Sequence, residues 1–116
     1  MYLKYSKLLK TIKTIEESDL HALSDKLRME LLMNILRGAT ETEVDLDEYY
    51  YKFKDWQAED KSVLLLKRHE TLNLEETVAM IMFYFAQERF HENLCTELLY
   101  DGTLLKLITR VKNFIY

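Results

Sequence analysis

An all-α fold is the fold class that this sequence predicts, and three observations lead to it. The 116-residue chain has no proline and only two glycines, so it lacks the turn residues that separate strands in all-β proteins. Apolar residues recur along most of the chain at spacings of three and four, the period of an amphipathic helix. One run, VAMIMFYFA at residues 78–86, is apolar on all sides and should be buried on all sides. We expect one domain, residues 1–116, with about five to six helices around a central helix at 74–89.

The first two helices are expected in the N-terminal third of the chain. A helix at about residues 2–16 would have one apolar stripe, formed by Tyr5, Leu8, Ile12 and Ile15. A second helix is expected within residues 19–37, where leucine and isoleucine recur at helical spacing from Leu20 to Ile35. Arg37 followed by Gly38 predicts its end, because a cation suits the last turn and glycine adopts the left-handed conformation beyond it.

Capping patterns predict where later helices begin. Thr40 and Glu43 have the spacing of a capping box, so a third helix should start there. Its inward face would consist of Leu46, Tyr49, Tyr50, Phe53 and either Trp56 or Gln57. A shorter fourth helix is expected at about residues 58–70, and Asn73 with Glu76 marks the start of the central helix. The last helix should begin after Gly102 and face inward with Leu104, Leu107 or Ile108, Val111 and Ile115.

The segment that follows the central helix, FAQERFHENLCTELLYDG at residues 85–102, contains most of the candidate site residues. The apolar face of the central helix would continue through charged residues, namely Glu88, Arg89 and Glu92. The apolar series resumes more than a quarter turn away, at Phe90, Leu94 and Leu98. We therefore expect the helix to break between residues 88 and 93. At such a break, Arg89 would donate hydrogen bonds to backbone carbonyls left without partners.

Metal binding is the specific hypothesis for this segment. HENLC has the form of the His-Glu-x-x-His helix of zinc proteases, with cysteine in the second ligand position. Glu88 precedes His91 by three residues, as in the Glu-x-x-His pairs of di-iron bundles, but the sequence has no second such pair. A zinc site would need a distant third ligand, for which His21 and His69 are the histidine candidates. Cys95 is more typical of a small buried hydrophobe than of a nucleophile. A metal-dependent hydrolase that uses Glu88, His91, Glu92 and Cys95 stays an alternative, and we expect no cofactor.

Charge is unevenly distributed in a chain whose net charge is −4. Residues 1–15 have four lysines and no acid, residues 41–60 have eight acids, and the last fourteen residues are basic again. Such asymmetry can be satisfied within the fold, across a homodimer or by a charged partner. Nucleic-acid binding through the basic ends, Lys4, Lys7, Lys10 and Lys13 among them, is a third candidate. It is not favoured, because the aromatic segment that could stack on bases lies in the acidic block.

A non-catalytic module that binds another protein or itself is the function we expect first. DEYYYKFKDW at residues 47–56 has more aromatic residues than one helix face can bury, and Tyr51 lies off the inward stripe. The binding candidates are therefore Glu88, Arg89, His91, Glu92 and Tyr51. We also expect a cytoplasmic protein without a membrane span, because lysines interrupt the apolar region that an N-terminal secretory signal needs, and the lone Cys95 fits a reducing compartment.

The C-terminal quarter, QERFHENLCTELLYDGTLLKLITRV, is similar to the pattern of a bacterial family of small helical proteins of unknown function. That pattern maps onto Glu88, Arg89 and Phe90, then onto Asp101 and Gly102, and then onto a leucine-rich final helix. His91 and Asn93 stand where the family pattern has a cysteine and a glycine. The resemblance implies a helical bundle of bacterial or phage origin and brings no known activity with it.

Overall fold

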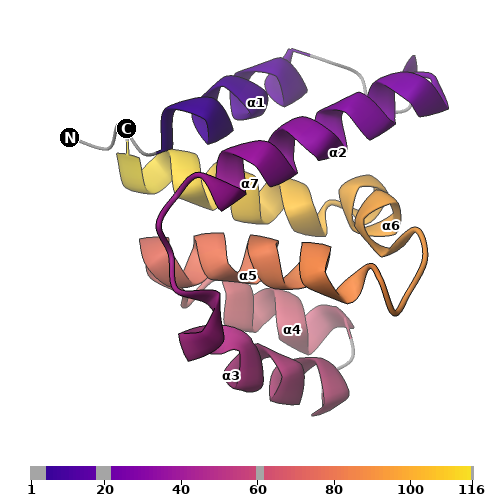
Figure 1. Ribbon diagram of the computed structural model, residues 1–116. Coiled ribbons are helices and arrows are strands. Elements are labelled where there is room, and N and C mark those ends of the chain that lie inside the picture. Colours follow the sequence, from indigo (N-terminus) through magenta and orange to yellow (C-terminus); the bar gives the residue numbers. More distant parts are fainter. Residues whose placement is uncertain (1–4, 18–21, 60–61, 116) are drawn as a thin grey trace.

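The computed structural model describes residues 5–17, 22–59 and 62–115, and the regular structure in these ranges is helical throughout (Figure 1). Lys4, Leu20 and His21, which belong to the predicted helices and candidate sites, lie outside the described residues. The all-α prediction is confirmed, with one helix more than the upper estimate because the segment after the central helix forms a helix of its own. The seven helices in the described ranges are α1 (Ser6–Glu16), α2 (Asp25–Thr40), α3 (Leu46–Glu59), α4 (Ser62–His69), α5 (Leu74–Gln87), α6 (Leu94–Asp101) and α7 (Thr103–Ile115).

Helices α5 and α7 lie side by side in the middle of the molecule (Figure 1). Helices α1 and α2 pack against each other on one side of this pair, α3 and α4 lie on the other side, and α6 contacts one end of α7. The central position predicted for the apolar helix is confirmed, since α5 buries almost every residue from Thr77 to Tyr84. The predicted inward face of α7 is also buried at Leu104, Leu107, Ile108 and Val111.

Gly38 corrects the predicted end of the second helix. α2 continues to Thr40, and Gly38 is a buried residue within it rather than its stop. A Cβ atom added at Gly38 would lie 2.7 Å from the backbone nitrogen of Leu8 and 2.8 Å from its Cα. Glycine is therefore required because α1 and α2 approach closely at this point, and not because the chain turns.

The two predicted capping boxes have different outcomes. Thr40 and Glu43 do not start α3, because Thr40 is the last residue of α2 and α3 begins at Leu46. By contrast, the Asn73 side chain accepts a hydrogen bond from the Glu76 backbone N–H at 2.8 Å, and the Glu76 carboxylate accepts one from the Asn73 N–H at 3.1 Å. The start of α5 is thus the reciprocal box that the sequence predicts.

None of the helices in residues 5–17, 22–59 and 62–115 combines the length and the apolar character that crossing a bilayer requires.

Candidate functional site

The predicted break after the central helix is present. α5 ends at Gln87 and α6 begins at Leu94, so Glu88, Arg89 and Glu92 lie in the connection and do not point into the core as a continued helix would require. Asn93 enters α6 with a φ of 66°, in the left-handed region that asparagine tolerates better than most residues. The Glu88 carboxylate accepts a hydrogen bond from the Cys95 backbone N–H at 3.3 Å, which ties the connection to the first turn of α6.

The role expected for Arg89 at this junction is wrong. Arg89 is exposed, its guanidinium lies 5.0 Å from the centroid of the Phe90 ring, and no hydrogen bond joins it to a carbonyl in the described part of the chain. Backbone N–H groups serve the carbonyls at the end of α5 instead. The Gln87 carbonyl, for example, accepts from Phe90 at 2.9 Å and from His91 at 3.1 Å. A tight backbone turn therefore satisfies the acceptors at the end of α5, and the Arg89 side chain does not.

The other candidates at the junction do not converge on one point. His91 Nε2 lies 3.4 Å from a carboxylate oxygen of Glu97, and both side chains are exposed, as is Glu92. Cys95 is fully buried, its thiol contacts the Tyr84 carbonyl oxygen at 3.6 Å, and burial, helped by the charge of Glu88, raises its pKa to about 12. Within residues 5–17, 22–59 and 62–115 no three histidine, cysteine or acidic side chains lie close enough to hold a metal ion. The geometry therefore gives the hydrolase alternative no support.

Tyr51, the remaining candidate, lies on a different element. Its side chain projects from α3 and is 73% exposed, and its ring contacts the neighbouring Tyr50 ring edge to face, with centroids 5.5 Å apart. The rest of the aromatic stripe faces inward, with Phe53 buried and Tyr50 and Trp56 packed against the core. The exposure expected for Tyr51 is thus confirmed, although nothing in this environment defines a ligand for it.

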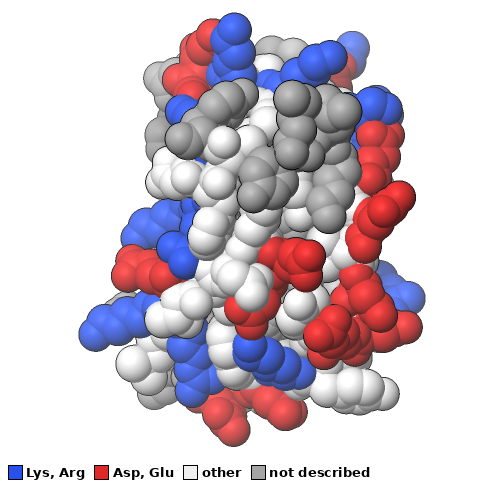
Figure 2. Space-filling model, turned by 90° about the vertical axis from the view of Figure 1, so that its left-hand side faces the viewer, with Lys and Arg blue, Asp and Glu red and all other residues white. Residues whose placement is uncertain are grey.

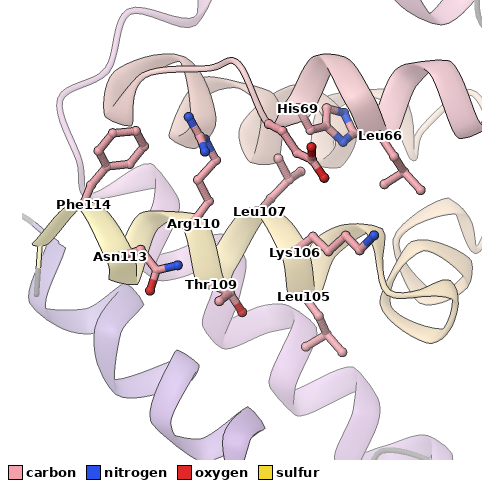
Figure 3. A pocket seen from close by; sticks show the side chains of 10 residues that line it. Leu66, His69, Leu105, Lys106, Leu107, Thr109, Arg110, Asn113 and Phe114 are labelled. Carbon is pink, nitrogen blue, oxygen red and sulfur yellow. The ribbon is translucent and has the colours of Figure 1, made fainter.

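A groove of about 510 Å³ between α4 and α7 has the features of a binding site, and the sequence analysis did not identify it (Figure 3). Leu107, Arg110 and Phe114 point from α7 toward the side of the groove where His69 and Leu66 lie (Figure 3). The apolar part of its lining consists of Leu66, Leu105, Leu107 and Phe114. The groove is therefore mainly apolar, with a small set of polar groups.

His69 is the last residue of α4 and belongs to the lining of this groove. Its side chain is almost wholly buried, with 2% of its surface exposed. Its Nε2 lies 3.0 Å from the Tyr84 hydroxyl oxygen, whereas its Nδ1 is buried and has no hydrogen-bond partner among the described residues. Burial lowers the pKa of His69 to about 4, and burial, helped by Asp101, raises the pKa of Tyr84. The imidazole and the phenol are therefore both neutral at pH 7. The hydroxyl can then donate to Nε2, which leaves the ring proton on Nδ1.

Three residues of α7 follow one another along the groove at a spacing of four: Lys106, Arg110 and Phe114. The Arg110 guanidinium is held in place, because Nε donates to the Leu72 carbonyl oxygen at 2.8 Å, Nη2 donates to the same oxygen, and the group lies 4.9 Å from the Phe114 ring centroid. Lys106 is exposed and forms no ion pair with a described residue. The sequence shows this spacing of four, but it does not show that His69 lies opposite.

The basic ends of the chain are partly neutralised within the fold. Lys7 on α1 pairs with Glu41 at 2.7 Å, and Lys112 on α7 pairs with Glu16 on α1. On the face drawn in Figure 2, acidic side chains predominate along one edge, while uncharged side chains form a band down the middle. These pairs support the interpretation that the charge asymmetry is satisfied internally, and they leave fewer cations for a nucleic-acid backbone.

Comparisons with known proteins give one match. A protein-family model described as "Family of unknown function (DUF6508)" matches residues 6–116, which is nearly the whole chain. No curated protein and no solved structure matches the chain.

Proposed function

Since this chain belongs to the DUF6508 family, to which no activity is assigned, we propose its function from the geometry of the α4–α7 groove: it is a non-catalytic, regulatory module that binds a small organic ligand there. A volume of about 510 Å³ lies within the range of small-molecule sites. Such sites combine apolar walls with a few polar groups that orient the ligand. The α4–α7 groove has this composition.

The observation that carries the proposal is the unsatisfied Nδ1 of His69. Buried polar atoms are nearly always hydrogen-bonded, because leaving one without a partner costs about 1–3 kcal/mol. His69 Nδ1 has no such partner among the described residues, and His69 is one of the residues that line the groove. A ligand that reaches the imidazole would supply the missing partner.

The same groups favour binding over catalysis. A general base needs a pKa near the working pH, whereas that of His69 is about 4. Tyr84 stays a protonated phenol, because burial raises its pKa, and the Cys95 thiol is buried with a pKa of about 12. Thus none of these three side chains is poised for proton transfer or nucleophilic attack at pH 7.

A protein partner or a second copy of the chain is the second candidate, and the side chain that favours it is Tyr51. An aromatic side chain that is 73% exposed supplies a large rigid contact area with a polar end, which is common at interfaces. Glu88, Arg89, His91 and Glu92 remain proposed contact residues of that partner. A cytoplasmic location remains a prediction.

Binding in the groove can be tested by nuclear magnetic resonance with a library of small organic fragments. We expect binding fragments to shift the backbone amide signals of α4 and α7. Thr109 is exposed and lines the groove, so Thr109→Trp should fill the groove and abolish these shifts, whereas Asp55→Trp, an equally large change at an exposed position of α3, should not. Fragment shifts that are spread over the surface, or that persist in Thr109→Trp, would refute the proposal.

A further inference from the structure

A second groove, between α1 and α2, has a volume of about 330 Å³ and a wholly polar lining. The residues of this α1–α2 groove are Lys7, Lys10, Thr11, Thr14, Asn34 and Arg37. Three of them are cations and none is a carboxylate, whereas the lining of the neighbouring groove between α1 and α7 includes Glu16, which pairs with Lys112. The α1–α2 groove shares no lining residue with the α4–α7 groove, so its ligand goes beyond the proposed function.

The packing of α1 against α2 brings cations of both helices to this groove. The two helices run antiparallel (Figure 1), and a Cβ atom added at Gly38 would lie 2.8 Å from the Leu8 Cα. Lys10 and Arg37 are two positions and one position from this contact, so their Cα atoms lie within about 14 Å of each other. Two long side chains that start this close and line one groove can both reach a single small anion.

The charge of Lys10 and Arg37 is not neutralised within the described part of the chain. Lys7 pairs with Glu41 at 2.7 Å, just beyond the end of α2, and this pair accounts for the third cation of the lining. No ion pair or hydrogen bond joins the side chain of Lys10, Arg37 or Asn34 to a described residue. An anion that enters the groove therefore breaks no existing pair and meets two positive charges.

We propose that the α1–α2 groove binds a phosphate monoester dianion, with Lys10, Arg37 and Asn34 as its donors. Two cations match the charge of such a group, which is about −2 above its second pKa of about 6. Ammonium and guanidinium groups both donate strong charge-assisted hydrogen bonds to phosphate oxygens. The lining has no apolar residue to hold an acyl or aryl body, so the bound part of the ligand is the phosphate itself. A small polar ester and a lipid headgroup both offer this group.

Methyl phosphate and dimethyl phosphate are suitable probes, because at about pH 8 the first is a dianion and the second is a monoanion of similar shape. Titrations followed by backbone amide chemical shifts should show that methyl phosphate shifts the signals of α1 and α2. Dimethyl phosphate should bind at least about threefold more weakly, as expected for one unit of charge at an exposed site. Added salt should weaken binding, because both cations are exposed and their charge is screened.

Three variants test the assigned donors. Lys10→Gln and Arg37→Gln should each weaken methyl phosphate binding by at least about threefold, whereas Lys13→Gln should leave it unchanged. Lys13 is the matched control, because it is an exposed lysine of the same helix that lines the groove between α1 and α7 instead. Circular dichroism should show that all three variants are as helical as the parent chain.

Vesicles of phosphatidylcholine with and without phosphatidic acid distinguish the two sources of the phosphate. Cosedimentation that needs phosphatidic acid and is lost in Lys10→Gln but not in Lys13→Gln would assign the group to a lipid, while binding of methyl phosphate alone would assign it to a free ester. Equal binding of the two methyl esters, or equal losses in Lys10→Gln and Lys13→Gln, would overturn the proposal. So would the absence of both α1–α2 signal shifts and vesicle binding, and the proposed function of the α4–α7 groove would then still stand.

Discussion

Acidification from pH 7 to pH 4 should destabilise this fold through His69. The imidazole is 2% exposed and neutral, its pKa is lowered from the ordinary value of 6.5 to about 4, and burial is the cause. The unfolded chain binds a proton at this side chain once the pH falls below about 6.5, whereas the folded chain does not until about pH 4. The unfolded state therefore gains stability relative to the fold across this window.

The size of the effect follows from the difference between the two pKa values. Each pKa unit corresponds to about 1.4 kcal/mol, so a pKa lowered to about 4 implies a loss of about 3 kcal/mol in the free energy of unfolding. The loss begins as the pH falls through 6.5 and is complete below about 4. Because domains of this size are usually stable by about 5–15 kcal/mol, such a loss is readily measured.

Denaturant unfolding at closely spaced pH values, followed by circular dichroism, is the appropriate assay. His69→Gln is the matched control, since an amide can still hydrogen-bond to the Tyr84 hydroxyl but does not titrate. Carboxylates contribute at lower pH. A hydrogen bond from Lys52 lowers the pKa of Glu76 below its ordinary value of 4.5, so its stabilisation is lost as the pH falls through that lower range. The difference between parent and variant at each pH removes this common background.

The parent chain should lose stability between pH 6.5 and pH 4.5 while His69→Gln remains nearly constant over the same interval. Parallel curves for the two proteins would show that His69 is not the group responsible. A chemical-shift titration of the His69 ring that gave a midpoint near 6.5 would refute the burial argument directly.

Three further predictions concern packing, hydrogen bonding and assembly. Gly38→Ala should lower the free energy of unfolding by about 1–3 kcal/mol in a denaturant melt, because its Cβ would lie 2.7 Å from the Leu8 nitrogen; an unchanged midpoint would mean that α1 and α2 can separate at no cost. Arg110→Ala should lower the free energy of unfolding by about 1–3 kcal/mol, because it leaves the Leu72 carbonyl unpaired, whereas Arg89→Ala should change it by no more than about 0.5 kcal/mol. Equal melting of the two variants would contradict this prediction. Light scattering at high micromolar concentration should give about twice the chain mass of 14.0 kDa, and a mass of 14.0 kDa rejects the homodimer.

Local signals in the sequence predicted several features that depend on near neighbours, although the Thr40 and Glu43 capping pattern did not start a helix. The Asn73 and Glu76 box, the buried stripe of α5 and the break before Asn93 follow from residue type and helical phase over a few positions. The helix end predicted at Gly38 was wrong because glycine is required there by the close approach of Leu8, which is thirty positions away in the sequence. A sequence alone does not show which helices approach each other closely. His69 is a similar case: Tyr84 of another helix creates its environment.

The pairing of α1 with α7, the first and last helices of the described ranges, has a consequence for the rate of folding. The Lys112–Glu16 pair joins residues 96 positions apart, and the two helices contact each other. Closing a loop of this length costs more chain entropy than forming a local contact, and this cost has to be met before the contact stabilises the fold. We therefore expect α1 to dock late and the chain to fold more slowly than a helical bundle in which only consecutive helices touch.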